Sequence, residues 1–294
     1  RKRADFKPYI LKSTDKGKTW ISISSNLPEN GTVHTIAQDH VKPELIFVGT
    51  EFGVYFTNNG GEKWTQLESG LPTISVRDID IQKRENDLVL GTFGRGIYIL
   101  DDYSPLRLID GEFKEKESFI FPINEALLFS QTRPLNLRNK GVQGESYYTA
   151  KNPQYGASFY YYLKNDIKTV KQKRQKAEKD ALEKNTDIAY PDYLELKAED
   201  TEVKPYLIFT IFDRNDKIIR KLRSSANAGI HRITWDLRHP STSPARFITP
   251  KPGRYSFGDA GKLIIPGNYK ISLSKCVNDS VSELFPPTPF KVVP

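Results

Sequence analysis

The sequence contains a single cysteine, Cys276, among 294 residues, which excludes an internal disulfide framework and a cysteine-cluster metal site. No apolar run approaches the roughly 18 residues that a membrane-spanning helix needs, so we expect no membrane span. The opening residues RKRADFKPY contain neither the apolar core of a signal peptide nor an initiator methionine. We therefore expect a processed chain or a piece of a longer one.

Motifs that carry chemistry are also scarce. The segment DRNDKIIRKLRS lacks the glycine and the final acid of a calcium loop, and the GxSxG, P-loop and dinucleotide motifs are absent. Carboxylate pairs such as Asp101 and Asp102 could serve a glycosidase, but nothing in the sequence separates them from charged strand ends. The histidines fall in no metal-ligand spacing such as HExxH, so we expect no metal and no cofactor; they are His34, His40, His231 and His239.

Charge of one sign does not dominate the chain. The formal net charge is +8, but 44 basic and 36 acidic residues are interspersed, which favours a well-solvated surface over a polyanion-binding one. The densest basic segment, residues 164–184, holds eight basic and four acidic residues and reads as a helix with a thin apolar stripe. A contact with nucleic acid or an anionic glycan is the alternative there; we favour a solvated helical insertion and expect no nucleic-acid partner.

What the sequence does contain is a repeated octapeptide, STDKGKTW at Ser13–Trp20 and TNNGGEKW at Thr57–Trp64. Both copies share a hydroxyl residue, an Asp or Asn, a Gly and a final Trp, and the two Trp residues are 44 positions apart. The flanking segments match as well: VHTIAQD from Val33 answers VRDIDIQ from Val76. A period of this length filled with short β-rich runs is typical of a propeller blade.

The chemistry of the octapeptide is that of a turn between two strands. An Asp or Asn oxygen can accept backbone N–H groups a few residues on, and the Gly supplies a positive φ. We expect both Trp side chains to be buried against the hairpin. The residues assigned to this structural motif are Ser13, Asp15, Gly17, Trp20, Thr57, Asn59, Gly61 and Trp64.

Both copies resemble the Asp-box, or bacterial neuraminidase repeat, of sialidase-type and sortilin-type β-propellers. That resemblance implies a peripheral, structural role, so a catalytic Asp15 is not expected. The segment GTFGRGIYILDD resembles a closing blade, where Arg95 is either ligand-facing or, as we favour, a solvated turn residue. Propellers close with typically about four to eight blades, so we expect the C-terminal part of a longer protein, with its upstream blades as a partner.

The second half reads as strands separated by turns, consistent with a β-sandwich. Within the Tyr-rich run, Tyr160 and Tyr162 would face away from Phe159 and Tyr161 and could stack on sugar rings. The last strands resemble the Ig-like domain of flagellar hook-capping proteins, which implies a fold and not an activity. The matching residues are Gly229, Ile233, Trp235, Asp236, Pro266, Gly267 and Tyr269.

The sequence thus predicts an all-β chain: the last blades of a β-propeller (residues 1–103), a connector (104–145) and an Ig-like β-sandwich (146–294) with a helical insertion near 165–187. We expect a non-catalytic binding or scaffold segment of a larger bacterial protein, with a glycan or protein ligand. The alternative is a sialidase-like glycoside hydrolase whose active site lies mostly in upstream blades. The family resemblance also implies a location in the cell envelope or outside the cell.

Overall fold

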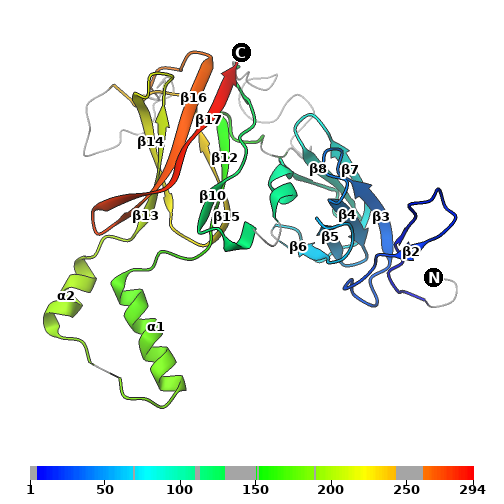
Figure 1. Ribbon diagram of the computed structural model, residues 1–294, viewed down its shortest axis with the longest axis horizontal. Coiled ribbons are helices and arrows are strands. Elements are labelled where there is room, and N and C mark those ends of the chain that lie inside the picture. Colours follow the sequence, from blue (N-terminus) through cyan, green and yellow to red (C-terminus); the bar gives the residue numbers. More distant parts are fainter. Residues whose placement is uncertain are drawn as a thin grey trace. The chain divides into compact units, whose positions relative to one another are not determined.

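The computed structural model describes residues 5–68, 70–109, 113–129, 150, 152–188, 190–242 and 261–294. The chain forms two compact units, Arg1–Glu115 (unit 1) and Lys116–Pro294 (unit 2), and most of their elements are labelled in Figure 1. Both units consist mainly of antiparallel strands, which confirms the prediction of an all-β chain. Of the expected connector, residues 130–145 lie outside the described part.

Unit 1 contains a four-stranded sheet in the order β3-β4-β5-β6, a three-stranded sheet in the order β7-β8-β9, and a small β1-β2 hairpin. Neighbouring strands pair antiparallel in chain order, because each short apolar run is followed by a turn. Two 3₁₀ turns follow, η1 (Ser104–Leu108) and η2 (Phe113–Glu115). The strands are β1 (Leu11–Lys12), β2 (Ile21–Ser22), β3 (Val33–Gln38), β4 (Ile46–Thr50), β5 (Gly53–Thr57), β6 (Thr65–Leu67), β7 (Val76–Gln82), β8 (Asp87–Thr92) and β9 (Ile97–Leu100).

The two larger sheets of unit 1 share one apolar core, in which Phe47 and Val54 meet Val76 and Leu88. The other face of the four-stranded sheet is covered by the segment before it, through contacts among Ile10, Leu27, Val48 and Trp64. Each layer therefore packs on the layer that precedes it in the chain. The β1-β2 hairpin carries the first octapeptide, and the β5-β6 hairpin carries the second.

The first strands of the two larger sheets of unit 1 start at the same end of the unit. Strand β3 packs beside β7, and Arg77 at the start of β7 contacts His34 at the start of β3. The starts of both strands therefore lie together with the β4-β5 and β8-β9 turns; we call this the loop end. The octapeptide of the β5-β6 hairpin lies at the opposite end, because β5 runs away from the β4-β5 turn.

Unit 2 is a sandwich of a three-stranded sheet, β10-β12-β15, and a five-stranded sheet, β11-β17-β16-β13-β14. The two sheets share one core because inward side chains alternate along each strand, as in the predicted Phe159–Tyr161 face of β12. The DRND segment forms the β13-β14 turn, as predicted. The strands are β10 (Ser118–Ile120), β11 (Ala126–Leu127), β12 (Ala157–Leu163), β13 (Tyr206–Phe212), β14 (Ile218–Ser225), β15 (Gly229–Trp235), β16 (Gly267–Val277) and β17 (Ser280–Val293).

Trp235 lies at the centre of the sandwich core and is fully buried. Its indole N–H donates to the carbonyl of Arg238 at 3.0 Å, so burial leaves no unsatisfied donor. Gly156 passes so close to this residue that a Cβ would lie 1.9 Å from the Trp235 carbonyl oxygen, at a φ of +127°. Only glycine fits at position 156.

The insertion between β12 and β13 contains two helices, α1 (Val170–Glu183) and α2 (Tyr193–Thr201), shown in Figure 1. The predicted insertion near 165–187 contains α1, whereas α2 was not predicted. Thr169 caps α1 by accepting from the backbone N–H of Gln172, and Glu195 accepts from the backbone N–H of Asp192 at the start of α2. No side chain of α1 is buried, which fits its thin apolar stripe.

Candidate functional site

The first octapeptide is held by hydrogen bonds within its own turn. The Asp15 carboxylate accepts from the hydroxyl of Ser13 at 2.8 Å and from the backbone N–H and hydroxyl of Thr19 at 2.9 and 2.6 Å. Ser13 Oγ in turn accepts from the backbone N–H of Gly17 at 2.7 Å. The Thr19 hydroxyl, the Thr19 backbone and Ser13 lower the pKa of the Asp15 carboxyl to about 2. The carboxylate serves as an acceptor for its own turn.

The second octapeptide makes three of the same bonds with an uncharged residue, while the bond from the Thr19 hydroxyl has no counterpart because Lys63 stands at that position. Asn59 Oδ1 accepts from the Thr57 hydroxyl at 2.6 Å and from the backbone N–H of Lys63 at 3.1 Å, and Thr57 Oγ1 accepts from Gly61. Since an amide oxygen accepts the shared hydroxyl and backbone N–H bonds in place of the carboxylate, these bonds require an acceptor and not a negative charge. This equivalence supports a structural role for both octapeptides.

The two Trp residues differ, and the prediction that both are buried is wrong for Trp20. Trp64 is 2% exposed and donates its indole N–H to the carbonyl of Ile23 at 2.8 Å. Trp20 is 59% exposed and donates to Gly17 of its own turn at 3.1 Å. Trp64 packs on the preceding repeat, whereas no earlier repeat in the described part lies against Trp20.

A buried ion pair lies at the end of unit 1 opposite the loop end. It joins Asp39, which follows β3, to Arg107 in η1. Two Arg107 nitrogens donate to the two Asp39 oxygens, each at 2.8 Å, and the Tyr103 hydroxyl donates at 2.6 Å. Burial acts to raise the pKa of the Asp39 carboxyl, but hydrogen bonds from Arg107, Tyr103 and the Lys42 backbone hold that pKa well below its usual range. This satisfied carboxylate anchors η1 to the sheet.

A different cluster lies at the loop end. His34 Nε2 lies 2.8 Å from Glu51 Oε2, and Arg77 NH1 lies 3.4 Å from His34 Nδ1. Because a guanidinium can only donate, Nδ1 must accept, so the proton of a neutral His34 is on Nε2 and is donated to Glu51. Arg77 NH2 also approaches the same Glu51 oxygen, at 3.5 Å. The three side chains come from β3, the β4-β5 turn and β7.

The β8-β9 turn extends the loop-end cluster. The Phe93 backbone N–H donates to Ser75, and the Phe93 ring lies under the Arg77 guanidinium, 5.3 Å from its centroid. Arg77 Nε and Ser75 Oγ are buried without a hydrogen-bond partner in the described part of the chain. Buried polar atoms ordinarily have partners, so this end of unit 1 has hydrogen-bonding capacity that its own described residues do not use.

A cavity of about 440 Å³ opens beside the cluster. Phe6 and Phe52 expose aromatic surface there, and Phe52 is 42% exposed. Asn30, Thr32 and Glu51 add amide, hydroxyl and carboxylate groups to the same wall. Aromatic faces combined with neutral polar groups and one carboxylate form a lining suited to a ligand that is apolar on one side and hydroxylated on the other.

The other sequence-predicted ligand-facing residues do not form a single site. Arg95 is exposed on the β8-β9 turn, at the same end as the Arg77–Phe93 pair. Tyr160 and Tyr162 lie half-buried in β12 of unit 2, paired with Arg232 and Ile230 of β15. A ligand-facing role stays a prediction for all three.

The sequence analysis missed the loop-end cluster, although one signal was present. In the alignment of the two repeats, His34 and Arg77 occupy equivalent positions directly after Val33 and Val76. Because a basic residue recurs at the start of the first strand of each sheet, the alignment predicts that His34 and Arg77 lie at the same end of unit 1. Glu51 lies far from either residue in sequence, and only the fold brings it to them.

Comparisons with known proteins identify no family. No family model and no curated protein matches the sequence. Solved structures that match include PorZ, a surface component of the type-IX secretion system of Porphyromonas gingivalis, at 12% identity and a TM-score of 0.25 over 97% of this chain and 25% of PorZ. The extracellular domain of BT4673 from B. thetaiotaomicron matches at 13% identity and a TM-score of 0.27 over 97% of this chain and 28% of that domain.

The chain thus spans about a quarter of the length of these structures. At TM-scores this low, the likeness carries no inference about this chain. Within the described residues, no helix is long and apolar enough to cross a membrane, and no group of three or more His, Cys, Asp or Glu side chains gathers as a metal site would require.

Proposed function

We propose that this chain is a non-catalytic binding and scaffold segment of a larger bacterial envelope or secreted protein. It comprises the last blades of an Asp-box β-propeller in unit 1 and an Ig-like sandwich in unit 2. The propeller assignment is supported by sheets whose strands pair in chain order. It is also supported by the place of the octapeptides in hairpins, the first between β1 and β2 and the second between β5 and β6, the last two strands of its sheet. The Ig-like assignment is supported by two facing sheets around a buried Trp235. The bacterial and envelope location rests on the Asp-box resemblance.

The observation that carries the binding function is the cavity at the loop end. Phe6 and Phe52 offer flat apolar surfaces, and Asn30 and Thr32 offer neutral hydrogen-bonding groups. A neutral sugar presents an apolar ring face and a rim of hydroxyls, so it complements this lining. We therefore place a neutral glycan in the cavity.

Binding is favoured over glycoside hydrolysis by the carboxylates. Hydrolysis of a glycosidic bond ordinarily uses two carboxyl groups on opposite sides of the bond. Among the described residues that line the cavity, Glu51 is the sole carboxylate, and His34 and Arg77 already engage it. We therefore assign Glu51 a structural role in the cavity wall and not the role of a catalytic acid or base.

The test is binding of the purified chain to immobilised neutral polysaccharides, namely xylan, mannan and dextran. We expect retention on at least one of them, reduced about tenfold or more by Phe52→Ala. Tyr190→Ala removes an even more exposed aromatic from unit 2 and should leave retention unchanged. No retention on any of the three, or equal loss in both variants, would contradict the glycan ligand. Turnover of chromogenic glycosides that Glu51→Gln abolishes would instead make the chain a hydrolase.

A further inference from the structure

A second cavity, of about 510 Å³, lies in unit 2 between α1 and the end of β12. Its floor is the segment that leads from β12 into α1, with Ala228 of the β14-β15 connection beside it, and its opposite wall is one face of α1. We call it the lysine cleft. Its lining residues are Lys164, Asn165, Asp166, Lys168, Lys173, Lys176, Ala177, Asp180 and Ala228.

Basic residues in α1 and in the segment before it lie on two different faces of the insertion. On the face toward α2, Arg174 donates to both Glu199 oxygens at 2.7 and 2.8 Å, and Lys171 pairs with Asp200 at 3.1 Å. These positive charges are therefore neutralised within the insertion.

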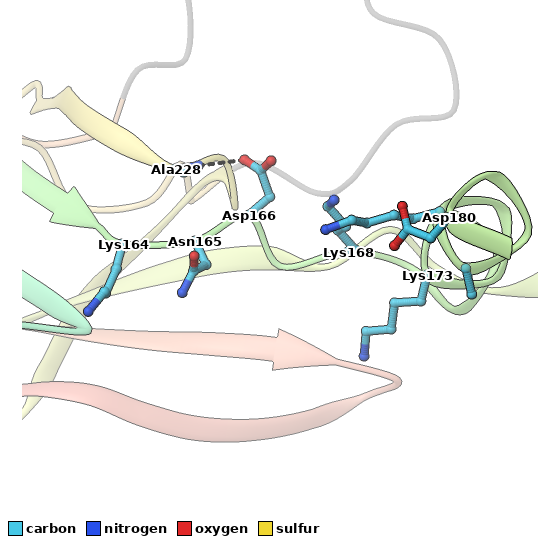
Figure 2. Close-up of a pocket in the computed structure, with 9 residues that line it drawn as sticks. Lys164, Asn165, Asp166, Lys168, Lys173, Asp180 and Ala228 are labelled. Atoms are coloured by element: carbon cyan, nitrogen blue, oxygen red, sulfur yellow. Dashed lines mark hydrogen bonds between the residues drawn. The ribbon is translucent and has the colours of Figure 1, made fainter. Parts of the chain in front are cut away.

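The lysines on the cleft side are not neutralised in this way. Lys168, Lys173 and Lys176 make no ion pair and no side-chain hydrogen bond within the described chain. One of the two cleft carboxylates, Asp166, accepts the backbone N–H of Ala228 at 2.7 Å, as Figure 2 shows. With four lysines against two aspartates, the cleft has a net positive lining, and Lys168, Lys173 and Lys176 supply charge that no ion pair with a described residue neutralises.

We propose that the lysine cleft binds an acidic polysaccharide, a ligand that carries both anionic groups and hydroxyls. Figure 2 shows the ammonium groups of Lys164, Lys168 and Lys173 spread along the cleft and not converging on one point. Such spacing suits several charges along a polymer better than a single phosphate ion. This inference concerns unit 2 alone and does not depend on the glycan proposed for unit 1.

The composition of the cleft favours a polysaccharide over a nucleic acid. Single-stranded nucleic acids are held largely by stacking of bases on aromatic side chains or arginine, and the described lining contains neither. Duplex DNA carries a charge about every 1.7 Å along its axis and would meet Asp166 and Asp180 directly. Acidic polysaccharides carry hydroxyls between their charges, and these hydroxyls can donate to the Asp and Asn oxygens of the cleft.

The test compares two triple variants of the full chain that remove the same charge. Lys168→Gln/Lys173→Gln/Lys176→Gln changes the cleft, and Lys171→Gln/Lys179→Gln/Lys184→Gln changes lysines of α1 and of its C-terminal cap that lie outside the cleft lining. The probes are alginate for carboxylate groups, dextran sulfate for sulfate groups, uncharged dextran, and duplex DNA. Because no α1 side chain is buried, both variants should fold, which circular dichroism and thermal unfolding check.

We expect the wild-type chain to bind alginate or dextran sulfate, with an affinity that falls as salt rises, and not to bind dextran at this cleft. The cleft variant should weaken that binding at least tenfold, and the control variant less than about twofold. Equal weakening in both variants would mean diffuse charge attraction and overturn the site. Tighter cleft-dependent binding of DNA than of either polysaccharide would overturn the ligand class, and so would no binding of any anionic probe.

Discussion

The indole N–H of Trp64 donates to the backbone carbonyl of Ile23, 41 residues earlier in the chain, at 2.8 Å. Around this bond, Asn26 contacts both the backbone N–H and the carbonyl of Trp64, at 2.7 and 2.9 Å. Gly61, with a φ of +100°, approaches Ile23 so closely that a Cβ would lie 2.7 Å from the Ile23 Cβ. The second octapeptide therefore joins its own layer to the layer before it.

This relationship predicts that the two Trp residues contribute unequally to stability. Trp64→Ala should lower the free energy of unfolding by about 3–5 kcal/mol, because a buried aromatic is lost from the contact between layers. Trp20→Ala should change it by about 0.5 kcal/mol or less, because this side chain is exposed. Denaturant titration measures both variants. Similar losses in the two would contradict the joining role assigned to Trp64.

The uncharged second copy predicts how the first octapeptide responds to substitution. Asp15→Asn should leave the unfolding temperature close to that of the wild type, because Asn59 accepts from the hydroxyl of Thr57 and the backbone N–H of Lys63 in its own turn. Asp15→Ala should lower the unfolding temperature more, because the Thr19 N–H and the Ser13 hydroxyl lose their acceptor. Thermal unfolding of both variants checks the order. A large loss with Asn would show that the charge itself matters.

The Asp39–Arg107 pair predicts a dependence of stability on pH. Asp39 has a pKa in the folded chain below its unfolded value, so its contribution is fully present above about pH 4, the ordinary aspartate value, and is lost as pH falls toward the lower folded pKa. Asp39→Asn should cost about 3–5 kcal/mol at neutral pH, because Arg107 is left half-buried without its partner.

The difference between wild type and Asp39→Asn should therefore narrow in acid, when urea unfolding is compared near pH 7 and near pH 3. Asp80→Asn, at an exposed position of β7, is the matched control and should leave stability unchanged at both values. A difference that stays constant with pH would contradict the ion-pair account.

The structure predicts that the helical insertion is dispensable for folding from Val170 onward, but not at Ile167. Replacing Val170–Thr201 by a Gly/Ser linker should change the unfolding free energy by less than about 1 kcal/mol, since loop length costs little and α1 buries nothing. Ile167 lies outside this segment: it packs against the sandwich core and its N–H donates to Ala226. Ile167→Ala should therefore cost about 2 kcal/mol. Loss of cooperative unfolding after the linker replacement would mean that the helices support the sandwich.

Local patterns predicted most of the strands and both octapeptide turns, because alternation and turn residues act over a few positions. The burial of Trp20 was predicted wrongly, because the partner of such a Trp lies in another repeat and not in its own turn. Helix α2 was missed although Asp192 and Glu195 have capping-box spacing. The loop-end cluster needed the fold, since Glu51 reaches His34 across a hairpin.

The most direct test of the account is hydrogen–deuterium exchange of the intact chain with and without the neutral polysaccharide that it retains. The account predicts slower exchange at the loop end, in peptides covering residues 30–34, 50–53 and 93–96, where the cavity and its supporting cluster lie. It predicts no change in the octapeptide turns, Ser13–Trp20 and Thr57–Trp64. Protection confined to those turns, or absent from unit 1, would contradict a glycan site at the loop end.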